Sequence, residues 1–130
     1  MSMSAISWKT GVGVNHVGAY QVSGRPFASG SVNASTATRV EFPRVTRWLY
    51  VTNDGGTPCR IGFSENGVNG TNHFTLSGSG NRTELLELKV SEVWLSGSNN
   101  VSVMAGLTNI EAKTLSGSVG PSWSGSAGVG

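Results

Sequence analysis

The chain has 130 residues and a mass of 13.5 kDa, which is enough for one hydrophobic core of ordinary size but not for two. Charged residues make up only 12% of the chain, well below the roughly one quarter that is usual for soluble domains, and the net charge is +2. The single cysteine excludes an internal disulfide, and no apolar run is long enough for a signal peptide or a membrane span.

From the N-terminus onward, the sequence predicts an arm over residues 1–16 and then short strands rather than helices. Apolar and polar residues alternate along most of these segments, which is the period of a half-buried strand. Pairs such as Asn-Gly, Asp-Gly and Gly-Gly mark the turns between them. The predicted strands cover residues 17–23, 26–32, 37–42, 45–52, 59–63, 73–77, 83–95 and 101–107.

The fourth and fifth predicted strands are expected to form a hairpin. Val45, Leu49 and Val51 should face the core, with Arg47 as an exception near a sheet edge. Cys59 begins the return strand on its apolar face. Because no His or Lys partner is evident nearby, we interpret this residue as a small buried hydrophobe rather than as a reactive thiol.

The opposite face of the fourth strand is unusual for a solvated sheet. It carries Trp48 and Tyr50 between Thr46 and Thr52, so two large aromatic rings occupy positions where charges would be expected. Something should cover these rings. The candidates are a terminal segment of the chain, a neighbouring subunit, or a sugar ring stacked on the indole.

Residues 83–95 form the most ambiguous segment. Its Leu, Glu and Lys residues favour a helix, yet Leu86, Leu88 and Val90 alternate with polar residues. We therefore predict one long strand, bent or bulged near Ser91.

About eight short strands separated by turns predict an all-β fold, a single antiparallel β-sandwich. A jelly roll is preferred over an immunoglobulin-like connectivity because it uses eight strands in two Greek keys. The predicted organisation is an N-terminal arm at 1–16, a sandwich domain at 17–113 and a Ser/Gly-rich C-terminal arm at 114–130.

Both arms contain large apolar residues that a plain flexible linker would lack. Trp8 lies in the N-terminal arm, and Trp123 and Val129 lie in the C-terminal arm. We expect these side chains, together with Trp48 and Tyr50, to be subunit contacts, because an arm repays its ordering entropy only against a partner. The alternative is a frayed, solubilising tail.

The basic residues are scattered along the chain. Only Arg39, Arg44 and Arg47 lie close together, whereas a nucleic-acid binder usually gathers its basic residues into a stripe. We interpret this weak basic cluster as the solvated rim of a strand or a subunit contact. A nucleic-acid partner is not expected.

The sequence lacks the residue constellations of an enzyme. His16 and His73 are the only imidazoles, and neither has a metal-ligand spacing. Residues 65–72 offer one carboxylate, which predicts a connecting loop rather than a calcium site. We therefore expect no catalytic residue, no bound metal and no cofactor.

Several features resemble the small single-jelly-roll structural proteins of virus and phage particles, including penton, minor capsid and decoration subunits. The residues that carry this resemblance are RWLYVTND (47–54), PCRIGFSENGVNG (58–70), VSVMAGLTNI (101–110) and PSWSGSAGVG (121–130). The resemblance implies a virion component, synthesised in the host cytoplasm, that assembles with copies of itself or with other capsid proteins.

The leading functional hypothesis is thus a non-enzymatic structural protein that associates through its sandwich faces and arms. The competing hypothesis is a carbohydrate-binding module or lectin that stacks sugars on Trp48, Tyr50 and Trp94. A knob that binds a host receptor would combine both roles.

Overall fold

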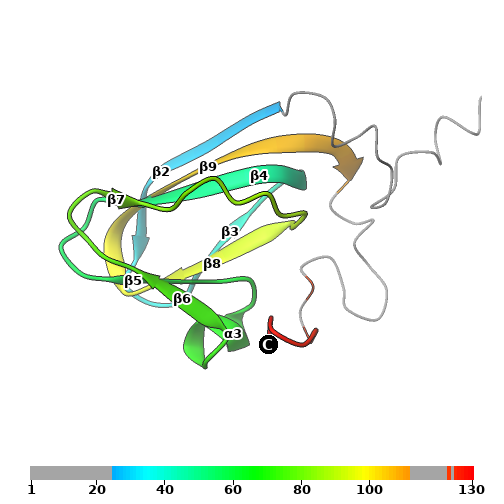
Figure 1. Cartoon of the computed structure of the whole chain (residues 1–130). Helices are drawn as coiled ribbons and strands as arrows, with labels where there is room; N and C mark the ends of the chain where they lie inside the picture. The colour runs from blue at the N-terminus through cyan, green and yellow to red at the C-terminus, as the bar shows by residue number, and fades with distance from the viewer. Residues whose placement is uncertain (1–24, 112–122, 124) are drawn as a thin grey trace, which may run out of the picture.

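The computed structural model describes residues 25–111, Trp123 and residues 125–130. They form two antiparallel sheets of four strands each, packed around one core (Figure 1), so the predicted antiparallel sandwich is confirmed. One sheet has the order β2-β9-β4-β7, with strands at Arg25–Ala34, Ser98–Glu111, Arg44–Asn53 and Asn81–Arg82. The other has the order β3-β8-β5-β6, with strands at Thr38–Glu41, Glu92–Ser96, Cys59–Gly62 and His73–Leu76.

The strands pair in a nested order. β2, the first strand described, pairs with β9, the last, while β3 pairs with β8, β4 with β7 and β5 with β6. A short helix, α3 (Glu65–Asn69), joins the innermost pair. The chain therefore runs as one long antiparallel hairpin that is folded over into two sheets.

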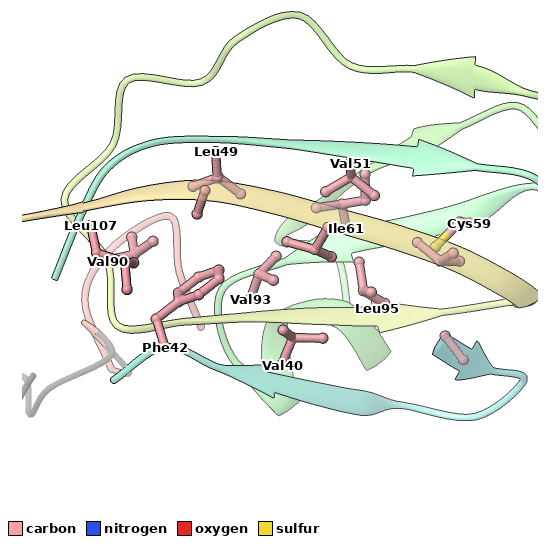
Figure 2. Close-up of a cluster of buried hydrophobic side chains, with 14 residues drawn as sticks. Val40, Phe42, Leu49, Val51, Cys59, Ile61, Val90, Val93, Leu95 and Leu107 are labelled. Atoms are coloured by element: carbon pink, nitrogen blue, oxygen red, sulfur yellow. The ribbon is translucent and has the colours of Figure 1, made fainter. Parts of the chain in front are cut away.

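Inward-facing side chains from both sheets meet in one core (Figure 2). Leu49 and Val51 of β4, Ile61 of β5, and Val93 and Leu95 of β8 are all fully buried. Each such side chain stabilises the fold by about 1.5–3 kcal/mol through the apolar surface it removes from water. The predicted inward face of β4 is thereby confirmed. The predicted hairpin of β4 with β5 is wrong, because the two strands lie in different sheets and do not pair with each other.

Asn53 is the centre of a buried hydrogen-bond network at one end of the sandwich. Its Nδ2 donates to the carbonyl oxygens of Thr57 at 2.8 Å and Leu76 at 3.1 Å. Its Oδ1 accepts from the Ser98 hydroxyl at 2.7 Å and from the Gly55 N–H at 3.2 Å. Both donors and both acceptor positions of the amide are used, so its burial leaves no unsatisfied group.

The prediction of one continuous strand over residues 83–95 is wrong. Only its last part belongs to a strand, β8, and the short β7 ends just before the segment begins. Between β7 and β8 the chain makes a single bridge, from Leu86 to Leu49 of β4.

The spacing of backbone hydrogen bonds explains this irregularity. The Thr83 N–H donates to the Val51 carbonyl, and Leu86 exchanges both of its bonds with Leu49. Between these hydrogen bonds β4 advances by two residues, from Leu49 to Val51, whereas the neighbouring segment advances by three, from Thr83 to Leu86. The extra residue breaks the alternation, and Leu85 is turned outward with 55% of its surface exposed.

The loop predicted over residues 65–72 contains the short helix α3. Ser64 caps it, because the Ser64 Oγ accepts a 2.9 Å hydrogen bond from the Gly67 N–H. Val68 on this turn is fully buried and anchors the helix to the sandwich.

Thr46 does not lie on the outer face of β4, as the alternation had predicted, but is fully buried. The pairing of β4 with β9 shifts register on both sides of Thr46, and such bulges re-aim side chains. The Thr46 hydroxyl donates to the Leu88 carbonyl at 2.6 Å and accepts from the Val90 N–H at 3.1 Å.

The arms predicted at 1–16 and 114–130 fall mostly on residues outside the described part of the chain. The N-terminal arm and the strand predicted at 17–23 lie wholly outside it. Of the C-terminal arm, Trp123 and residues 125–130 are described.

The core predicts a clear contrast between two leucines on neighbouring segments. Leu49→Ala should lower the free energy of unfolding by about 2–5 kcal/mol, because it leaves a cavity between the sheets. Leu85→Ala, which removes the same atoms from an exposed site, should change it by no more than about 0.5 kcal/mol. Urea unfolding followed by circular dichroism measures both, and equal losses would contradict this assignment of the core.

Candidate functional site

The outer face of the sheet β2-β9-β4-β7 carries the two predicted aromatic residues. Trp48 lies opposite Gly106 in the β4–β9 ladder, and Tyr50 lies opposite Met104. The indole of Trp48 lies against Gly106, because a Cβ atom at position 106 would come within 2.6 Å of its Cε2 atom. The Tyr50 hydroxyl donates to the Met104 sulfur at 3.1 Å.

The two rings lie parallel to each other as one stacked pair, which we call the platform. The centroids of Trp48 and Tyr50 are 6.2 Å apart, and their planes differ by only 6°. The guanidinium of Arg82, on β7, lies 5.1 Å from the centroid of Tyr50, within the range of a cation–π contact. Both rings are half-buried by the sheet beneath them, and the outward part of each remains open among the described residues.

Beside this platform the sheet surface is hollowed. A shallow cavity of about 300 Å³ extends from Tyr50 across β9 to β2, and hydroxyl groups lie along it. Its lining includes Ser29, Thr52 and Ser102, together with Ala28, Gly30 and Met104. We call the platform and this cavity the aromatic face.

The composition of the aromatic face defines what it can bind. Flat rings with one neighbouring cation and several hydroxyls suit either an apolar protein surface or the face of a sugar ring. The face contains no carboxylate, imidazole or thiol that could act as a general base or nucleophile.

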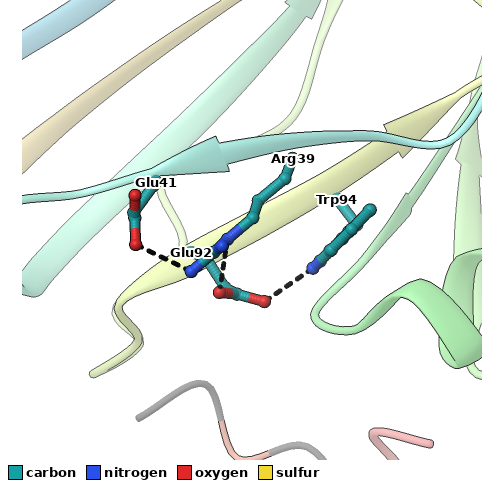
Figure 3. Close-up of polar contacts among 4 residues, drawn as sticks. All are labelled: Arg39, Glu41, Glu92 and Trp94. Carbon is teal, nitrogen blue, oxygen red and sulfur yellow. Dashed lines mark hydrogen bonds and ion pairs between the residues drawn. The ribbon is translucent and has the colours of Figure 1, made fainter.

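Trp94 does not join this platform, although the lectin hypothesis grouped it with Trp48 and Tyr50. It lies on β8 in the other sheet, and its neighbours Val93 and Leu95 face the core. Its indole Nε1 donates to the Glu92 carboxylate at 2.6 Å (Figure 3).

Glu92 also forms an ion pair with Arg39, one member of the predicted basic cluster. Its carboxylate is only 5% exposed and accepts from the Arg39 Nε at 2.8 Å. Arg39 also pairs with Glu41, at 2.7 Å (Figure 3). The charge of Arg39 is thus matched by two carboxylates, which disfavours a phosphate site there.

The other two members of the basic cluster lie on β4. Arg44 donates to the Asn109 carbonyl at 3.4 Å, so its guanidinium is directed towards β9. Arg47 is half-buried and lines a cavity with Glu87, Leu88 and Lys89. The arginines therefore belong to different local environments and do not form one patch around a common centre.

The remaining predicted subunit contacts lie near the ends of the chain. Trp8 is outside the described residues. Trp123 packs against the core of its own sandwich, and the Val129 carbonyl accepts from Ser64 at 2.8 Å. Whether these residues also contact a second molecule stays a prediction.

Among the described residues, no three His, Cys, Asp or Glu side chains are grouped closely enough to hold a metal ion. The same part of the chain contains no helix of the length and apolar character that a membrane span requires. Cys59 is fully buried, as predicted.

Sequence reasoning identified Trp48 and Tyr50 but missed their supporting residues. Gly106 and Met104 are more than 50 positions away along the chain, and only the β4–β9 register brings them beneath the rings. Arg82 was missed because β7 has only two residues, too few to show a strand period. The glycine within an otherwise apolar strand was the one available signal, since such a residue often marks a close approach.

No protein-family model, curated protein or solved structure matches this chain. The functional conclusion therefore rests on the geometry of the site and on the pairing of the strands.

Cys59 makes the stability of the fold depend on pH. Burial raises the pKa of its thiol, and a hydrogen bond to the Ser96 backbone opposes this in part. The unfolded chain, with a thiol pKa of about 8.5, loses the proton first. The folded state is therefore increasingly disfavoured above that pH, by at most about 1.4 kcal/mol per pH unit.

We expect the urea-unfolding free energy of the wild type to fall more steeply between pH 8 and pH 10 than that of Cys59→Ala. The two proteins differ only at position 59, so the contributions of all other groups cancel in the comparison. Parallel curves for the two proteins would show that the thiol does not contribute. Alkylation by iodoacetamide should also be slow until urea unfolds the chain.

Proposed function

We propose that this chain is a non-enzymatic structural subunit of a virus or phage particle, built as a single jelly roll. The nested strand pairing supports this proposal most strongly: first with last, second with second-last, and so on to the innermost pair. Two Greek keys wound into eight strands produce this order, and viral capsid domains and lectins are among the proteins that use it.

The aromatic face is the proposed contact surface. Interfaces between proteins are enriched in Trp, Tyr, Met and Arg and depleted in Lys and Glu. Trp48, Tyr50, Met104 and Arg82 reproduce that composition within one patch. The partner is a second copy of the chain or another capsid protein, and closed symmetry would let one patch serve every copy. Such a subunit would be made in the host cytoplasm and reside in the virion.

A second candidate function is glycan binding, as in a lectin or a host-receptor-binding knob. The half-buried Trp48 and Tyr50 rings favour it, since sugars stack on aromatic rings whose outward part is open. The hydroxyls of Ser29, Thr52 and Ser102 beside the rings would supply hydrogen bonds to the sugar.

The assembly role predicts that the purified chain forms an oligomer that depends on the aromatic face. Trp48→Ala should weaken association about 30-fold, because a central interface tryptophan contributes about 2 kcal/mol or more. The measurement is size exclusion with light scattering over a dilution series, and circular dichroism verifies the fold.

Phe74→Ala is the matched control. Phe74 is 41% exposed on β6 of the other sheet, so its removal takes away a comparable ring outside the aromatic face. This change should leave the oligomer intact. A wild type that stays monomeric at all concentrations would contradict the assembly role, and glycan-array binding lost in Trp48→Ala would favour the lectin role.

A further inference from the structure

The C-terminal segment of the chain is bound to the sandwich as a clasp. The indole Nε1 of Trp123 donates to the Lys89 carbonyl at 2.6 Å, and the ring is half-buried against the core. The residues after it form a compact turn, in which Ser126 and Val129 donate in succession to Trp123 and Ser126, both at 3.0 Å. We call Trp123 and residues 125–130 the terminal clasp.

The turn of the clasp docks beside α3, where Figure 1 shows the red C-terminal segment. The Ser64 hydroxyl donates to the Val129 carbonyl at 2.8 Å while it accepts from the Gly67 N–H. Gly67 lies directly beneath the clasp, because a Cβ atom there would collide with the Val129 carbonyl and approach the Asn72 carbonyl to 2.9 Å. Ser64 is only 3% exposed.

The contacts of the clasp are with parts of the chain remote from it in sequence. Its partners Lys89 and Ser64 lie 34 and 65 positions earlier, in the irregular segment after β7 and at the start of α3. Residues 112–122 connect the clasp to β9. The clasp therefore binds its groove, formed by Lys89, Ser64 and Gly67, in the way a tethered peptide ligand would.

We propose that this groove is also an interaction surface for the clasp of a second copy of the chain, so that two molecules exchange their C-terminal segments. An exchanged clasp makes the same hydrogen bonds and buries the same indole as a clasp closed within one molecule. Exchange therefore needs no new interface, which is why segment swapping is a low-cost route to association. The inference deepens the proposed assembly role, and rests on it for the setting in which copies meet.

The tether determines when exchange occurs. Covalent attachment gives a bound segment an effective concentration within its own molecule, typically of about a millimolar. In dilute solution the clasp therefore closes on its own sandwich. Exchange becomes competitive when neighbouring copies are held at a similar local concentration, as they would be in an assembled shell.

Two complementary variants of the full chain test the exchange. Trp123→Ala keeps an open groove but lacks the indole of the clasp. Gly67→Ala keeps an intact clasp, but its new methyl group blocks its own groove. Neither molecule can close a full clasp alone, yet the clasp of the Gly67→Ala chain fits the groove of the Trp123→Ala chain.

The variants are mixed at equal concentrations near a millimolar, and heterodimers of twice 13.5 kDa are counted by native mass spectrometry. We expect dimers to be at least about tenfold more abundant in the mixture than in either variant alone, since only the mixture offers a complete clasp and groove. Equal abundance in the three samples would overturn the proposal.

Association through the aromatic face would add dimers to all three samples equally, so it is distinguished from exchange. A second measurement does not require the clasp variants to fold. Isotopically heavy and light Trp48→Ala chains, which retain both clasp and groove, are concentrated together and analysed in the same way. Mixed dimers are expected, and their absence would overturn the exchange while leaving the role of the aromatic face untouched.

Discussion

The pairing of β4 with β9 is the interaction on which the rest of the structure depends. In its main register Leu49 lies opposite Ala105 and Val51 opposite Val103, and all four side chains point into the core. The residues between them on each strand point outward and build the aromatic face. Because side chains alternate along the regular part of these strands, one register determines the core and the aromatic face together. A slip by one residue would exchange the two.

The second sheet and the irregular segment after β7 complete the hydrophobic core around the β4–β9 pair. β8 and β5 cover the inner face of β4 and β9, and Asn53 ties the turn after β4 to the ends of β6 and β9. The segment before β8 runs along β4 through isolated hydrogen bonds, and Trp123 packs beside it. The clasp thus contributes to the core although it follows the last strand.

The features that were predictable from the sequence are those expressed in local alternation. Leu49 and Val51 showed the inward face of β4, Trp48 and Tyr50 its outer face, and Cys59 the start of β5, although β5 joins the other sheet and not a hairpin with β4. All of these lie in runs where every second residue shares one environment. The sandwich class followed from the same signal, and the nested pairing did not, since period two carries no information on which strands are neighbours.

The features that were missed depend on tertiary contacts. Leu86 and Val90 obeyed the strand period, but the chain advances three residues from Thr83 to Leu86 where β4 advances two, so the expected strand did not form. Thr46 was assigned to the wrong face because bulges on both sides of it rotate the backbone. Arg82 and the docking of Trp123 were invisible locally, because each acquires its role from a contact more than 30 positions away.

Position 106 is a glycine that lies against Trp48. Adding a single methyl group there would change the shape of the aromatic face. Alanine there would displace the indole of Trp48 from its place against the sheet, whereas the flanking Ala105 and Leu107 are buried on the opposite, inner face. At this one position, a substitution would therefore change the outer surface of the sheet without changing its packing against the core. Replacing this glycine would therefore be a direct way to change what the aromatic face can bind while the sandwich stays the same.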